Sequence, residues 1–209
     1  MEFAFEAISA EEFDRQRSAY EPLTDALRRL IEVGIHTAVD EATAREALHH
    51  LTAATQLLER EQRSERTTLR HADTGQSVAW ANPAVGLRNA IAPPMVIVHE
   101  PDGSCWSEFT LGPAYEGPPG WVHGGICALL LDHILGEVAS EGLSLPKFTG
   151  TISVKYLRGT RLGPVRAEAF VERSGDIKTY ARGVISDADG VTVEAEGVFI
   201  KPAWAREVG

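Results

Sequence analysis

The spacing of apolar residues changes along the chain from a helical period to an alternating one. In residues 1–70, apolar side chains recur three or four positions apart, as on one face of an amphipathic helix. Asp40 lies between two such series and has a side chain that suits a helix N-cap. We therefore predict that residues 1–70 are helical. The region is either a packing appendage, a lid or an oligomerisation arm. The apolar positions are Leu23, Leu27, Leu30, Ile31, Ala44, Ala47, Leu48, Leu51, Ala54 and Leu58.

Residues 71–93 have no regular period. Glycines, asparagines and prolines interrupt every candidate element in this stretch, which is typical of a loop. We therefore predict two parts: an N-terminal helical arm over residues 1–75 and a main domain over residues 76–209.

The main domain reads as two strands, one helix and four more strands. "MVIVHEPDGSCWSEFTL" predicts a hairpin with its turn at Asp102-Gly103. In "GPPGWVHGGICALLLDHILG", Gly117–Gly136, the prolines oppose a helix, so the helix should begin near His123. The helix is apolar on almost every side and should therefore be buried. The later strands are predicted in "FTGTISVKYLRGT", "VRAEAFVERS", "IKTYARGVIS" and "VTVEAEGVFIK".

Alternation within these later strands favours an antiparallel sheet. Short turns at residues 162–164, 174–176 and 187–190 predict antiparallel neighbours, and no helix separates the strands as a doubly wound parallel sheet requires. The predicted fold is α+β, an antiparallel sheet wrapped around one central helix. The residues expected to share a face are Ile152, Val154 and Tyr156 in one strand, and Val191, Val193, Ala195 and Phe199 in another.

Composition excludes several classes of function. The 209 residues are 44% hydrophobic and 24% charged, with a net charge of −10, which opposes nucleic-acid binding. No stretch has the apolar length of a membrane helix, and the N-terminus does not resemble a targeting peptide. Cys105 and Cys127 show no disulfide or metal spacing, which fits a reducing cytoplasm. We expect a cytoplasmic protein without membrane or nucleic-acid partners.

The central helix carries two features that suit acyl chemistry. Gly124 and Gly125 fall in its first turn, where backbone N–H groups lack intrahelical acceptors and can bind an oxyanion or a polarised carbonyl. Asp132 is an acid among apolar residues. Burial would raise its pKa and make it a candidate base or nucleophile, although pairing with a distant residue or a partner's His133 would also explain it.

The spacing of these two features predicts a dimer. Gly124 and Asp132 are eight residues apart, or about 12 Å along a helix at 1.5 Å per residue. They cannot contact the same carbonyl within one subunit. If they cooperate, two such helices must lie antiparallel across a subunit interface, with Gly124 of one chain facing Asp132 of the other.

"GPPGWVHGG", followed by Asp132 nine residues after the histidine, resembles the hotdog-fold acyl-CoA thioesterases of the PaaI-like group. The resemblance covers roughly residues 94–201 and includes "KYLRGTRLG". It implies a homodimer, often paired into a tetramer, that hydrolyses acyl-CoA. Asp132 would then be base or nucleophile, and the amide of Gly124 or Gly125 would polarise the carbonyl. His123 would shape the helix start, and Thr149 would position the lytic water. The chain departs from the family pattern at Gly117 and Gly159.

Other candidates are weaker or belong to alternative functions. Lys155, Arg158 and Arg161 could meet the phosphates of CoA, or could be ordinary solvated charges. We expect no metal and no cofactor, because no His/Cys ligand spacing and no glycine-rich phosphate loop is present. "GQSVA" at Gly75 lacks the second glycine of a serine-hydrolase elbow.

The alternatives to a thioesterase are a non-catalytic acyl-CoA-binding module and another hotdog enzyme, such as an enoyl-CoA hydratase or dehydratase.

Overall fold

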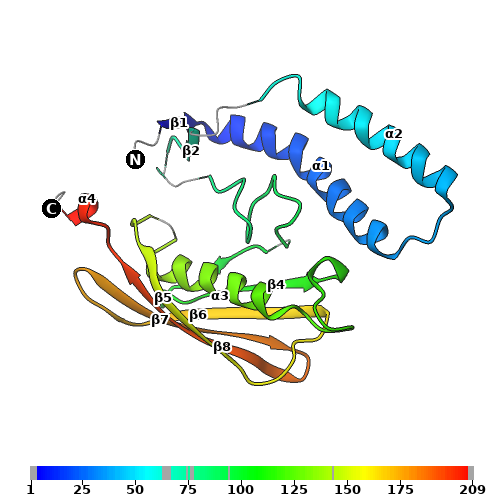
Figure 1. Cartoon of the computed structure of the whole chain (residues 1–209). Helices are drawn as coiled ribbons and strands as arrows, with labels where there is room; N and C mark the ends of the chain where they lie inside the picture. The colour runs from blue at the N-terminus through cyan, green and yellow to red at the C-terminus, as the bar shows by residue number, and fades with distance from the viewer. Residues whose placement is uncertain are drawn as a thin grey trace.

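A computed structural model describes residues 4–62, 67–73, 75, 78–93, 95–142 and 144–206. A curved antiparallel sheet wraps around one helix, α3, and two long helices lie on the far side of α3 from the sheet (Figure 1). The predicted α+β arrangement of the hotdog fold is confirmed. The predicted division at residues 75 and 76 stays a prediction, and Gln76 and Ser77 of the "GQSVA" stretch lie outside the described residues.

The N-terminal region contains the two predicted helices, α1 (Ala10–His36) and α2 (Glu41–Leu58). Asp40 caps α2, as predicted, because its side chain accepts a hydrogen bond from the N–H of Thr43. The expectation that residues 1–70 are helical throughout is wrong at both ends. Strands β1 (Ala4–Ile8) and β2 (Thr67–His71) flank the helices and pair in parallel, a long-range pairing that helical periodicity does not reveal.

The helical region is attached mainly through α1. Arg28 of α1 donates to the backbone carbonyls of Ala92 and Asn89, in the loop that separates the helices from α3. The long helix α2 has no buried residue, and the apolar side chains of Leu48 and Leu51 are exposed in the single chain. The helices therefore extend beyond the main core, as Figure 1 shows.

The main sheet has the strand order β3-β4-β6-β7-β8-β5 and is antiparallel throughout. The predicted hairpin at Asp102-Gly103 joins β3 to β4, and all four later strands form where alternation placed them. The other elements are the 3-10 turn η1 (Pro113–Tyr115) and the short helix α4 (Ala203–Arg206). The strands are β3 (Val98–His99), β4 (Cys105–Leu111), β5 (Phe148–Tyr156), β6 (Gly163–Ser174), β7 (Lys178–Asp187) and β8 (Gly190–Ile200).

Two details of the sheet differ from the predictions. The turn at residues 162–164 does not join neighbours, because β5 crosses over to the far edge and pairs with β8 instead of β6. Val191 is exposed while Thr192 is fully buried, because a register shift in the β7–β8 pairing interrupts the alternation there.

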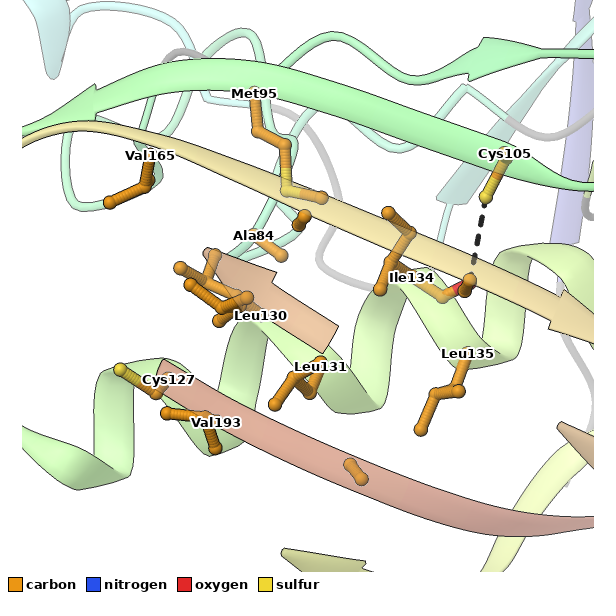
Figure 2. Packing of buried hydrophobic residues seen from close by; sticks show 14 of the residues in the cluster. Ala84, Met95, Cys105, Cys127, Leu130, Leu131, Ile134, Leu135, Val165 and Val193 are labelled. Carbon is orange, nitrogen blue, oxygen red and sulfur yellow. Dashed lines mark hydrogen bonds between the residues drawn. The ribbon is translucent and has the colours of Figure 1, made fainter. Parts of the chain in front are cut away.

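Helix α3 (Gly124–Ala139) begins one residue after His123, as predicted, and supplies the centre of the core. Leu130, Leu131, Ile134 and Leu135 are fully buried against the concave face of the sheet (Figure 2). A second stripe of α3 is less buried in the single chain. It consists of Gly125, Ala128, Leu129, Asp132 and Gly136, which recur at helical spacing.

Candidate active site

The loop before α3 is held in place by short-range contacts. Gly120 has φ +79°, a left-handed conformation that favours glycine, and its N–H donates to the Glu116 carboxylate at 2.7 Å. The backbone of Glu116 also forms an isolated antiparallel β-bridge with that of Val122. A Cβ at Gly117 would lie 2.9 Å from the Cα of His123, so glycine permits the close approach of the helix start. The loop therefore presents the first turn of α3 in a defined position.

The two glycine amides in that first turn differ. The Gly125 N–H donates to the Nδ1 atom of His123, the N-cap residue, at 2.9 Å. The Gly124 N–H has no hydrogen-bond acceptor among the residues that the structure describes. Gly124 thus carries the free amide at the positive end of the helix dipole, and the amide of Gly125 is already engaged.

Asp132 and Thr149 meet across the gap between α3 and the edge strand β5. The Thr149 hydroxyl donates to the Asp132 carboxylate, with 2.9 Å between Oγ1 and Oδ1. This is the only hydrogen bond to the Asp132 side chain within the described parts of the chain. The structure therefore brings together two residues that lie 17 positions apart in the sequence.

A β-bulge at Gly150 makes this contact possible. Ile152 and Val154 face the core from β5, so strict alternation would place Gly150 inward and Thr149 outward. The register with β8 shifts between Thr149 and Thr151, which inserts one extra residue. The shift places Thr149 opposite the buried Phe199, on the same face as Ile152 and Val154.

Asp132 is less buried than its apolar neighbours predicted. It lies on the partly exposed stripe of α3 and not on the stripe that faces the sheet. Its carboxylate therefore remains accessible from the open side of α3 in the single chain, apart from the contact with Thr149.

The other end of β5 reaches the start of α3. The Tyr156 hydroxyl donates to the backbone carbonyl of Gly124 at 2.9 Å. Because β5 runs antiparallel to α3, this one strand contacts the helix at Asp132 with Thr149 and at Gly124 with Tyr156. Desolvation by the surrounding residues raises the pKa of Tyr156, which keeps its hydroxyl protonated.

The three basic candidates differ in how far they are engaged. Arg158 donates to both carboxylate oxygens of Asp187 and to the Gly190 carbonyl, so its guanidinium already has partners within the chain. That pairing lowers the pKa of Asp187 to about 2. The side chains of Lys155 and Arg161 are 74% and 66% exposed, with longer ion-pair contacts of 3.9 and 3.5 Å. These two are more accessible to a phosphate than Arg158.

His133 follows Asp132 on α3 and therefore lies about 100° around the helix axis from it. Burial lowers its pKa, and its Nε2 atom is buried without a hydrogen bond, 3.9 Å from the Glu137 carboxylate. Burial raises the pKa of Glu137, which is hydrogen-bonded to His99 at 3.1 Å.

No cluster of three or more His, Cys, Asp or Glu side chains suited to a metal ion occurs in the described ranges. Likewise, no helix described is both long and apolar enough to cross a membrane.

Three features of the site were not predicted from the residues. The Gly150 bulge had a signal, since a glycine inside a strand pattern often marks a bulge. Tyr156 was predicted to share a strand face with Ile152 and Val154, but its hydrogen bond to Gly124 was not predicted, because it depends on the crossover of β5. Gly159 accommodates Trp121, because a Cβ there would lie 2.6 Å from the indole ring.

Comparisons with known proteins bear on the family of this chain. Residues 119–194 match the family model described as the thioesterase superfamily. Acyl-coenzyme A thioesterase THEM5 of Mus musculus is 33% identical over a 99-residue alignment that covers 44% of this chain. The matched segment spans 38% of the length of that mouse relative.

A solved structure resembles almost the whole chain. The crystal structure of a thioesterase superfamily protein is 33% identical, covers 86% of this chain and 94% of its own, and has a TM-score of 0.75. Residues 76–209 alone are less than two thirds of the chain, so this similarity includes part of the N-terminal region. The chain therefore belongs to the thioesterase superfamily.

Proposed function

We propose that this protein hydrolyses acyl-CoA thioesters to a free acid and CoA, as a member of the PaaI-like group in the cytoplasm. The observation that carries the proposal is the hydrogen bond between Thr149 and Asp132 on the helix whose first turn has the free Gly124 amide. A carboxylate and an unengaged helix N-terminal amide are the two groups that thioester hydrolysis needs: a base or nucleophile, and a donor for the carbonyl oxygen.

The reaction assigns one role to each group. The Gly124 N–H binds the thioester carbonyl oxygen and stabilises the negative charge that develops on it. Asp132 accepts a proton from a water molecule as the water oxygen attacks the carbonyl carbon, and Thr149 orients the carboxylate. The C–S bond then breaks, CoA leaves as a thiolate that takes up a proton, and the acid is released. Alternatively, an Asp132 oxygen attacks the carbonyl carbon, the C–S bond breaks, and CoA leaves as a thiolate that takes up a proton. Water then hydrolyses the resulting anhydride, which releases the acid and restores Asp132.

The proposal requires a homodimer, because Gly124 and Asp132 are about 12 Å apart on one helix. Two features support such a dimer. Strand β5 is at the edge of the sheet, paired only with β8 in the described chain, so its outer edge can pair with a second β5. The less-buried stripe of α3 contains Gly125, Ala128 and Gly136, whose small size lets a second α3 approach closely. A two-fold axis would place Gly124 of one subunit beside Asp132 of the other, and two dimers could pair into a tetramer.

The acyl-CoA substrate is supported by the name of the mouse relative and by accessible charge near the site. Lys155 lies at the end of β5 that contacts Gly124, and Arg161 follows shortly after that end. Both side chains could bind phosphate groups of CoA there. The Arg161 guanidinium also lies 5.4 Å from the centre of the Trp121 ring. Arg158 would support this region through Asp187.

The test is thiol release from a panel of acyl-CoAs, measured for the wild type, Asp132→Asn and Asp176→Asn. We expect turnover by the wild type and by Asp176→Asn, a control in an exposed turn, and its loss in Asp132→Asn. Undiminished turnover in Asp132→Asn would refute the assigned base. Binding without turnover would favour a non-catalytic module, and water addition to an enoyl-CoA without thiol release would favour a hydratase.

The oligomer is tested by sedimentation. We expect a dimer or a dimer of dimers at micromolar concentration. A strict monomer under conditions where the enzyme is active would refute the composite site.

A further inference from the structure

Tyr156 contacts the first turn of α3 in two ways that thioester hydrolysis, as described above, does not use. Its hydroxyl donates to the Gly124 carbonyl at 2.9 Å. Its ring also fills the space beside the Gly124 Cα, because a Cβ built there would lie 3.2 Å from the ring carbon Cε1. The side chain thus covers Gly124 and bonds to its backbone at the same time.

The peptide group that Tyr156 contacts is held from its other side as well. The Gly124 carbonyl and the Gly125 N–H belong to the same planar peptide unit. The carbonyl accepts from Tyr156, and the N–H donates to His123 Nδ1 at 2.9 Å. Two side chains from different elements therefore fix the orientation of this one peptide plane.

Such restraint matters because two adjacent glycines have unusual backbone freedom. Neither residue has a side chain that could anchor the first turn, and the first N–H groups of a helix have no intrahelical acceptors. The free Gly124 N–H belongs to the peptide unit directly before the restrained one. Its direction depends on the φ and ψ angles of Gly124, which the restrained peptide limits.

We propose that Tyr156 is a positioning residue that, together with His123, holds the Gly124 amide in the direction required to bind the thioester carbonyl. This inference rests on the proposed function. Tyr156 does not touch the reacting atoms and acts through the Gly124 peptide. The raised pKa of Tyr156 supports the role, since the hydroxyl stays a donor over the whole pH range in which the enzyme would work.

The variant Tyr156→Phe keeps the ring over Gly124 and removes only the hydrogen bond. Removing an oxyanion donor altogether lowers kcat by roughly 100- to 1000-fold, so loosening a donor that is still present should lower kcat by about tenfold. KM should change by less than about twofold, because the restraint acts on the transition state more than on substrate binding. Tyr180→Phe on β7 is the matched control, and its kcat should equal that of the wild type.

A second measurement is independent of activity. In protein labelled with ¹⁵N-glycine, the Gly124 and Gly125 amide signals should shift and their hydrogen exchange should accelerate in Tyr156→Phe, while the remaining glycine signals stay in place. The unchanged signals also show that the variant is folded.

The outcomes separate this inference from the proposed function. If the wild type cleaves no acyl-CoA, the proposed function fails, and unperturbed Gly124 and Gly125 signals would then overturn the restraint as well. If the wild type is active, an unchanged kcat in Tyr156→Phe overturns the positioning role alone. A fall in kcat/KM that arises only from KM overturns it too, since that result assigns Tyr156 to substrate binding.

Discussion

The contact between Thr149 and Asp132 leads to the most direct prediction about catalysis. Thr149→Val keeps the β-branched shape of the side chain but removes the hydroxyl that donates to the carboxylate at 2.9 Å. Hydrogen bonds to charged groups contribute about 1.5–3 kcal/mol. Thr149 is exposed in the single chain, which places this bond at the low end of that range. A loss of about 1.5 kcal/mol in the transition state corresponds to a kcat roughly tenfold lower.

The assay is steady-state thiol release from the best acyl-CoA substrate, compared with Thr151→Val. Thr151 lies on the same strand beyond the bulge and is exposed, with no hydrogen bond to Asp132. We expect kcat to fall roughly tenfold in Thr149→Val, because each 1.36 kcal/mol of lost transition-state stabilisation lowers the rate tenfold. In Thr151→Val, kcat should stay within about twofold of the wild type. Equal kcat values for the two variants would show that the Thr149 hydroxyl does not act on Asp132. They would refute the claim that the bulge at Gly150 places Thr149 for catalysis.

Three further predictions concern stability. Gly159→Ala should lower the free energy of unfolding in urea by about 1–3 kcal/mol and alter the near-UV circular dichroism of Trp121, because its Cβ would lie 2.6 Å from the indole ring; an unaltered spectrum would contradict this. Leu130→Ala, in the core, should cost about 2–5 kcal/mol in urea unfolding, whereas Leu51→Ala, 40% exposed on α2, should cost less than about 1 kcal/mol. A loss above about 2 kcal/mol at Leu51 would show that this face of α2 is covered in solution. Burial lowers the pKa of His133 below 6.5, so the unfolded chain binds more protons than the folded one just below that pH, and stability is lost as the pH falls. His133→Gln should therefore reduce the fall of Tm between about pH 7 and pH 5 in a thermal melt, and a fall as steep as that of the wild type would count against a buried neutral His133.

Local patterns in the sequence determined most of the secondary structure. Alternation located the later strands. Asp40 marked the start of α2 through its capping side chain, and the prolines before His123 marked the start of α3. The apolar character of α3 also predicted that a sheet must wrap around it. These features follow from interactions between residues close in sequence, which period and capping describe well.

Long-range placement was decided only by the tertiary structure. A short turn after β5 suggested a neighbouring β6, yet β5 crosses to the far edge and pairs with β8. The pairing of β1 with β2 likewise joins segments separated by both long helices. Such pairings depend on which sheet edge is available, and local periodicity carries no information about that.

The candidate site shows the same division at the level of single residues. The sequence by itself determined that Gly124, Gly125 and Asp132 share one helix, and helix geometry alone separates Gly124 from Asp132 by about 12 Å. It did not determine which glycine amide is free, because that depends on the hydrogen bond from Gly125 to His123. Nor did it determine that Thr149 faces Asp132, because the bulge at Gly150 reverses the side on which Thr149 lies. The sequence therefore identified the residues of the candidate site, whereas the orientations of their groups depended on backbone geometry that only the folded sheet defines.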